Sequence, residues 1–317
     1  FMWASVFRGG FTRDLFQQVT ETSARTLQTL LNRSLISHAT GRRFEMHPLL
    51  RQYAREKLEQ TGELAASKQA HLAALLNYAQ HHADRMYDGQ HYLASLEALD
   101  VEQDNIRAAL EWALAGNNID QGVALILANG EFWLARSMAM TAITDVEKAI
   151  QQSDEPMLHY WRSVYLDRLG DVDGSLESTQ YVIEYGKAHQ QPEILAYGQK
   201  QMGMIVATAE KARPLLKAAL SHAQQADNQH LIATCYNNLS VISSEPDENT
   251  SAQHDVDSSS MLQKSLEIYE DLGDLYGISR VTNNLAIQYS EDPEQRPEAK
   301  PLMEYSLQLK RQIGDRA

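Results

Sequence analysis

The chain has little of what several protein classes require. Among 317 residues it holds one cysteine, Cys235, so an internal disulfide and a multi-cysteine metal site are both excluded, and a reducing compartment is expected. Its longest apolar run, Val123–Ala128, falls far short of the roughly 18 residues that a membrane-spanning helix needs. We therefore expect a soluble, cytoplasmic protein in which Cys235 is a small packed residue.

Motifs that bind nucleotides or support catalysis are also absent. The sequence contains no Gly-x-x-x-x-Gly-Lys-Ser/Thr loop, no Gly-x-Gly-x-x-Gly, no His-Glu-x-x-His and no Gly-x-Ser-x-Gly, the spacings that cradle phosphates, ligate zinc or expose a nucleophile. We therefore predict that the chain by itself is no enzyme, with no catalytic residue, no metal ligand and no cofactor of its own.

Charge is unevenly distributed along the chain. The formal net charge is −14, yet residues 1–60 contain nine Lys or Arg against five Asp or Glu. The acidic remainder argues against nucleic acid along most of the chain, because phosphate attraction needs clustered cations. The basic first segment leaves that question open for residues 1–60.

The sequence nearly copies itself towards its end. Segment Ser265–Asp274 recurs as 306–315, and Cys235–Ser240 recurs as Val281–Ala286. Self-similarity at a few tens of residues is typical of a solenoid, in which each helical pair buries its apolar face against its neighbours.

A second pattern extends the repeat backwards. Each unit has a small residue on its first helix and, on its second helix, three residues spaced four and then three apart, which share one helix face. The five units are Gly130 with Ala142/Val146/Ala149, Ser163 with Ser175/Thr179/Val182, Gly203 with Ala212/Leu216/Ala219, Ser240 with Ser258/Leu262/Ser265 and Ala286 with Ala299/Met303/Ser306. This pattern resembles the tetratricopeptide repeat and predicts an α-solenoid of about five helix pairs over residues 119–317. The polar, acidic stretch Ser244–Asp257 is predicted to be a loop within it.

Residues 1–60 predict a compact winged-helix domain. Helices are expected near Thr12–Val19, with Thr12 as N-cap, and at Ser23–Arg33. Two short alternating segments, Ser34–His38 and Arg43–His47, predict a hairpin. Pro48 then opens an amphipathic helix that reaches Gln60. The overall fold class is therefore all-α, with strands only in this hairpin.

Residues 61–118 predict a helical connector. Helices are expected at Leu64–Met86, Tyr92–Leu99 and Glu102–Ala115, and Gly116 ends the block. The tryptophans of the amphipathic helices are expected in the core rather than in a site; they are Trp112, Trp133 and Trp161.

Three segments of the N-terminal part, Val6–Phe11, Leu30–Ile36 and Phe44–Ala54, together resemble the winged helix that closes the nucleotide-binding module of bacterial STAND ATPases of the NB-ARC class. Segment Glu102–Leu114 is similar to the part that joins that winged helix to the repeats in the same regulators.

The resemblance also implies a role for one histidine. Met46-His47-Pro48 falls where the family has Met-His-Asp, whose histidine contacts the β-phosphate of bound ADP. His47 would then contact ADP in a parent protein that uses ADP or ATP with Mg²⁺ in an upstream nucleotide-binding domain. Pro48 departs from the family pattern, because it removes the usual carboxylate.

Partners of such solenoids usually dock on the concave face. Residues three and six positions before the small residue of a unit are expected to face that groove, and their aromatic, amide and cationic groups suit a protein or peptide ligand. These residues are Tyr160, Tyr197, Lys200, Asn237, Arg280 and Asn283.

We interpret the chain as the sensor and signal-transduction half of a STAND switch, cut from a longer parent at both ends. An inducer on the repeats would release the winged helix from ADP and allow oligomerisation, in transcription control or in defence. Two alternatives stay open. One is a DNA-binding winged-helix regulator, although the helix Ser23–Arg33 offers only Arg25 and Arg33 as outward cations. The other is a constitutive repeat adaptor.

Overall fold

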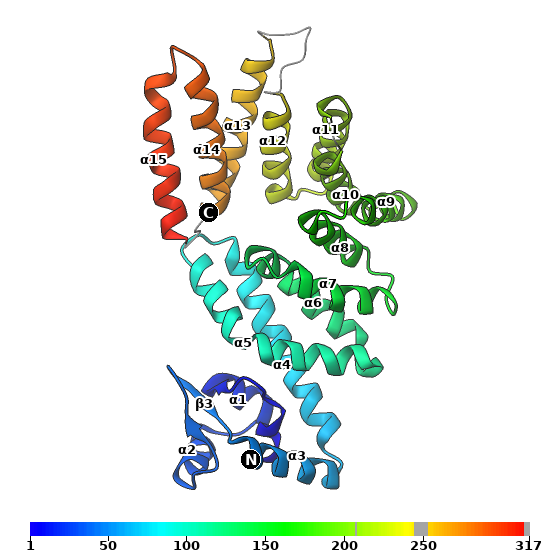
Figure 1. The fold of residues 1–317 in the computed structure, drawn as a ribbon, viewed down its shortest axis with the longest axis vertical. Coiled ribbons are helices and arrows are strands. Elements are labelled where there is room, and N and C mark those ends of the chain that lie inside the picture. Colours follow the sequence, from blue (N-terminus) through cyan, green and yellow to red (C-terminus); the bar gives the residue numbers. More distant parts are fainter. Residues whose placement is uncertain (207, 244–252, 314–317) are drawn as a thin grey trace. The chain divides into compact units, whose positions relative to one another are not determined.

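A computed structural model describes residues 1–206, 208–243 and 253–313, without the side chains of residues 243 and 253–257. The described chain is almost entirely helical (Figure 1), which confirms the all-α class. It divides into two compact units. Unit 1 comprises residues 1–83, 95–136 and 147–153, and unit 2 comprises residues 84–94, 137–146 and 154–317.

Residues 1–61 of unit 1, here called the N-terminal module, combine helices with a small sheet. The elements are η1 (Met2–Val6, a 3₁₀-helix), β1 (Phe11–Thr12), α1 (Arg13–Thr20), α2 (Ala24–Asn32), β2 (Ser37–His38), β3 (Arg43–Glu45) and α3 (Pro48–Thr61). The predicted hairpin is β2–β3, paired antiparallel with Ser37 opposite Glu45. Strand β1, which the sequence analysis missed, pairs with the other edge of β3.

Local chemistry sets the helix boundaries in this module. Thr12 caps α1, since its hydroxyl accepts a hydrogen bond from Leu15 N at 3.2 Å. Pro48 occupies the first turn of α3, where a missing N–H costs nothing. The aromatic rings of Phe11 and Phe16, both fully buried, stack at 5.4 Å and tie β1 to α1.

Helices α4 (Leu64–Met86) and α5 (Tyr92–Trp112) follow the module. The bounds of α4 are those predicted, but the predicted break between Leu99 and Glu102 is wrong. No glycine or proline interrupts that stretch, and the pattern of buried residues continues through it on one face of α5. Asp100 lies on the exposed side and forms an ion pair with Arg136 at 2.5 Å.

A buried polar network joins the module to α5. Arg43 forms an ion pair with the fully buried Glu102, and its Nη2 donates to the carbonyl oxygens of Gly9 and Gly10 at 3.0 and 3.1 Å. Asn105 donates to Gly10 O at 2.9 Å and to Glu102 at 2.6 Å. Because these charges and amides satisfy one another, their hydrogen bonds offset part of the desolvation cost of burying Glu102, and the network positions the module against α5.

Beyond α5, five residues form a π-helical turn, η2 (Ala113–Asn117). Gly116 adopts the left-handed conformation there with φ +91°, which confirms it as the end of the block. Helix α6 (Ile119–Ala135) follows, and α7 (Ala139–Ile150) comes next.

Unit 2 contains a row of antiparallel helix pairs (Figure 1). The helices are α8 (Pro156–Leu169), α9 (Val172–Ala188), α10 (Pro192–Ile205), α11 (Ala209–Gln225), α12 (Gln229–Ser243), α13 (Gln253–Leu272), α14 (Leu275–Glu291) and α15 (Arg296–Gln312). Each helix packs on the next, and α10 contacts both α8 and α12, as α12 contacts α14. In a tetratricopeptide-like solenoid, the first helix of each pair contacts the first helix of the next pair, as α8, α10, α12 and α14 do here.

The predicted small residues lie where two helices approach closely. A Cβ added at Gly203 would come within 2.8 Å of Leu216 Cγ, so only glycine fits there. The hydroxyl of Ser163 lies 2.6 Å from that of Thr179 and 3.0 Å from that of Ser175. Polar groups therefore satisfy one another in a contact that other units fill with apolar side chains.

The fifth unit departs from the predicted register at one position. Met303 is 43% exposed, whereas the partly buried Leu302 packs into the core with Leu285 and Leu309. The buried stripe of α15 advances by three residues from Ala299 and then by four to Ser306, so Leu302 takes the central position.

The sequence analysis extended the predicted loop Ser244–Asp257 too far towards its C-terminal end. Residues 244–252 lie outside the described part of the chain, but residues 253–257 form the first turn of α13. A polar stretch without periodicity can extend a helix beyond its buried face, because each added residue closes a further backbone hydrogen bond.

Single residues mostly confirm the expected core. Cys235 is fully buried, and burial raises the pKa of its thiol to about 12, so it is a packed residue and not a reactive one. Trp133 and Trp161 are buried, but Trp112 is only half-buried. Within the described ranges, no helix combines the length and apolarity needed to cross a bilayer.

Candidate functional site

His47 lies at the N-terminus of α3 on the surface of the module. Its Nδ1 accepts a hydrogen bond from Leu49 N at 3.3 Å, which makes it the N-cap, while the preceding Met46 is buried. Leu49 and Tyr53, on the same helix, are 71% and 54% exposed. His47 is therefore accessible, and apolar side chains unusual for free surface lie beside it.

Three of the predicted groove residues form one cluster in unit 2. Lys200 on α10 donates to the Tyr160 hydroxyl at 2.8 Å and lies 5.1 Å from the centre of the Tyr160 ring and 6.0 Å from that of Tyr197. Tyr160 is buried and Tyr197 partly so, and burial raises the pKa of Tyr197 to about 12. The two tyrosines, one on α8 and one on α10, therefore fix the position of the Lys200 ammonium group.

The other three groove residues lie further along the same set of helices. Asn237 is buried and accepts a hydrogen bond from Asn284 at 2.9 Å, a partner that the sequence analysis did not single out. The Arg280 guanidinium lies 5.8 Å from the Tyr276 ring centre, and Asn283 is half-buried.

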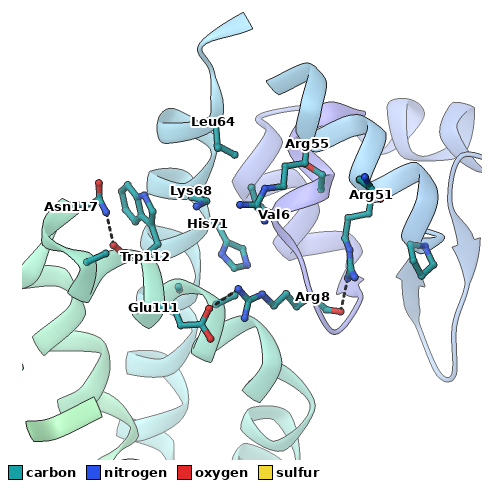
Figure 2. A pocket seen from close by; sticks show the side chains of 16 residues that line it. Val6, Arg8, Arg51, Arg55, Leu64, Lys68, His71, Glu111, Trp112 and Asn117 are labelled. Carbon is teal, nitrogen blue, oxygen red and sulfur yellow. Dashed lines mark hydrogen bonds and ion pairs between the residues drawn. The ribbon is translucent and has the colours of Figure 1, made fainter. Parts of the chain in front are cut away.

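Unit 1 contains a half-open cavity of about 740 Å³ that sequence reasoning missed (Figure 2). Arg8, Arg51 and Arg55 line it from the N-terminal module, and Lys68 lines it from α4. Glu111 is the single carboxylate among the lining residues. Spacing of four places Arg51 and Arg55 on one face of α3, and this was the available sequence signal.

The charges around the cavity affect one another. Arg8 donates to Glu111 at 2.6 Å, and this hydrogen bond lowers the pKa of the Glu111 carboxyl. The pKa of Lys68 is also lowered, first by burial and then by the positive charges of Arg55 and Arg8. Glu59, which pairs with Arg55 at 3.3 Å, and Glu111 act in the opposite direction, but burial and the two arginines outweigh them.

His71 on α4 completes the cavity wall. It is 2% exposed, and burial lowers its pKa to about 4. Its Nε2 has no hydrogen-bond partner among the described residues. Trp112, expected in the core, forms another part of the wall. That expectation fails because α5 turns this face towards the cavity.

Comparison with known proteins identifies one architecture. No protein-family model and no curated protein sequence matches the chain. A crystal structure of a Signal Transduction ATPase with Numerous Domains (STAND) protein with a tetratricopeptide repeat sensor, from Pyrococcus horikoshii, matches with a TM-score of 0.54 and 13% sequence identity. The match covers 99% of this chain and 50% of that one, so this chain spans half the length of its structural neighbour. At this identity the likeness shows the fold.

Proposed function

We propose that this chain is the sensor and signal-transduction part of a STAND-type nucleotide switch. The observation that carries the proposal is that 99% of the chain matches one half of a STAND protein with a tetratricopeptide repeat sensor. The resemblance of Phe44–Ala54 to the family's winged helix supports the same reading from the sequence side. In this proposal the chain senses, and an upstream domain of the same protein binds and exchanges the nucleotide.

The N-terminal module acts as the winged helix that holds the resting state. His47 is exposed at the start of α3 and can donate to a phosphate oxygen of ADP bound to the upstream domain. Leu49 and Tyr53 would be covered by that domain, which explains their exposure in the chain alone. Release of the module then permits exchange and oligomerisation.

His47→Ala tests this mechanism in the full-length protein. A hydrogen bond to a charged group contributes about 1.5–3 kcal/mol, so we expect fluorescent ADP to dissociate at least about tenfold faster and basal signalling to rise. His38→Ala changes another exposed histidine of the module and should leave the release rate unchanged. Equal release from the His47→Ala and wild-type proteins would remove His47 from the mechanism.

The lysine cluster of unit 2 is the proposed contact for the inducer. Lys200 is held in place by Tyr160 and Tyr197, and an ordered cation beside aromatic rings suits an acidic segment of a protein or peptide. Little ordering entropy is lost on binding, because the ammonium group is already fixed.

An array of acidic peptides tests this contact directly. Peptides that bind the wild-type chain should bind Lys200→Met at least about tenfold more weakly, the loss expected for one charged contact. Lys217→Met removes an exposed lysine from the second helix of the same pair and should have no effect. Peptides that bind Lys200→Met and wild type equally would place the partner elsewhere.

A further inference from the structure

The cavity of unit 1 carries an inference that does not depend on the proposed function. His47 is not among its lining residues, although the adjacent Pro48 is, and every lining residue belongs to unit 1. Its walls come from two parts of the unit: the N-terminal module supplies three arginines, and helices α4 and α5 supply Lys68, His71 and Trp112 (Figure 2).

The first argument is charge. Four cations line the cavity, and two of them are paired: Arg8 with Glu111 at 2.6 Å, and Arg55 with Glu59, outside the lining, at 3.3 Å. Arg51 and Lys68 have no carboxylate partner among the described residues, and Arg51 donates to the backbone carbonyl of Arg8 at 3.2 Å. Like charges held together are unfavourable unless an anion neutralises them. The surplus of positive charge therefore selects an anion.

The second argument is size and shape. A volume of about 740 Å³ is in the range of small-molecule sites, roughly 300–1,000 Å³, and far exceeds that of an inorganic ion. Trp112 supplies a flat apolar surface suited to a sugar ring or a base. The occupant is therefore organic.

We propose that this cavity binds a small phosphate monoester, of the sugar phosphate or mononucleotide class. Arg51, Arg55 and Lys68 hold the phosphate, and Trp112 covers the carbon skeleton. Because the two groups of cations belong to different parts of unit 1, the ligand bridges the N-terminal module and α4.

Titration calorimetry on the 317-residue chain tests the proposal with defined probes: ribose 5-phosphate, AMP, ribose and inorganic phosphate. We expect ribose 5-phosphate or AMP to bind at least tenfold more tightly than inorganic phosphate, and ribose not to bind. Tighter binding of ribose 5-phosphate than AMP identifies the sugar phosphate class, and the reverse identifies the mononucleotide class. Absence of binding by both esters, or equal affinity for inorganic phosphate, would overturn the proposal.

Variants locate the binding in this cavity. Lys68→Gln removes a crowded cation and should weaken ester binding at least tenfold, as should Arg55→Gln. Lys57→Gln changes a lysine of α3 that lies over Tyr53, outside the cavity lining, and should bind as wild type. If Lys68→Gln and Arg55→Gln both bind as tightly as wild type, the cavity is not the site.

Discussion

Glu102→Ala is expected to lower the free energy of unfolding of unit 1 by about 3–5 kcal/mol, the usual cost of breaking a buried ion pair from one side. The Glu102 side chain is fully buried and carries the charge opposite Arg43, whose side chain is 14% exposed. Without the carboxylate, a guanidinium group lies buried beside two carbonyl oxygens that only partly replace it. Asn105 loses an acceptor as well.

Native-state hydrogen exchange is the measurement, because it separates local from global opening. Amides of α1, α3 and the β1–β3 sheet should lose protection in Glu102→Ala, while those of α10–α15 in unit 2 keep theirs. Asp100→Ala is the matched control. Asp100 lies on the same helix as Glu102 and pairs with Arg136, the C-cap of α6; the two side chains are 41% and 29% exposed, and such solvent-accessible pairs contribute under about 1 kcal/mol. If Glu102→Ala also lowered the free energy of unfolding by less than about 1 kcal/mol, that result would contradict the role of the network.

Replacing both partners refines the test. Arg43→Met with Glu102→Met removes both charges, and buried pairs replaced by apolar residues are often close to neutral. Arg43 also serves the carbonyl groups of Gly9 and Gly10, so we expect the double variant to recover only part of the loss.

Whether Gly277→Ala raises or lowers the free energy of unfolding depends on Tyr269. A Cβ at Gly277 would lie 2.4–2.6 Å from three atoms of the Tyr269 ring, and that ring is 1% exposed and bonded through its hydroxyl to Thr234 at 2.9 Å. The ring cannot move aside, so overpacking costs about 1–3 kcal/mol. Better helix propensity offsets about 1 kcal/mol of this, which leaves a net loss of up to about 2 kcal/mol.

A double-mutant cycle isolates the contact. Tyr269→Ala alone should cost about 3–5 kcal/mol through the cavity it leaves. In that background, Gly277→Ala should turn neutral or stabilise by up to about 1 kcal/mol, because the new methyl group enters empty space. Urea unfolding followed by circular dichroism gives the four values. Tyr276→Ala removes a more exposed ring and should not rescue Gly277→Ala; rescue by both would refute the contact.

Much of the helical architecture could be predicted because its signals are local. Thr12, Pro48 and Gly116 mark element boundaries by their own backbone chemistry. Small residues such as Gly203 mark helix crossings, since no larger side chain fits there. Two predictions failed: Met303 was placed in the core instead of Leu302, and α5 was divided into two helices. In both places a few residues of sequence pattern fitted two structures, and contacts with neighbouring helices selected one of them.

The two candidate sites also differ in how far the sequence alone could predict them. His47 could be proposed from the sequence, because its motif and the following proline are contiguous. The cavity could not, because its walls come from residues scattered between positions 5 and 117. The sequence shows a basic surplus in residues 1–60, but not that Arg51 and Arg55 share a space with Lys68 and His71.

By itself, then, the sequence determined the helices, their pairing and the small residues at which they cross, because backbone hydrogen bonds and side-chain periodicity act over a few neighbouring positions. Only the tertiary structure decided which charges meet. Arg8 pairs with Glu111, 103 residues away, and Arg43 with Glu102. The protonation of His71 follows from burial by residues distant in the chain. Electrostatic energy depends on distance in space and on exclusion of water, and both are fixed only when the chain has folded.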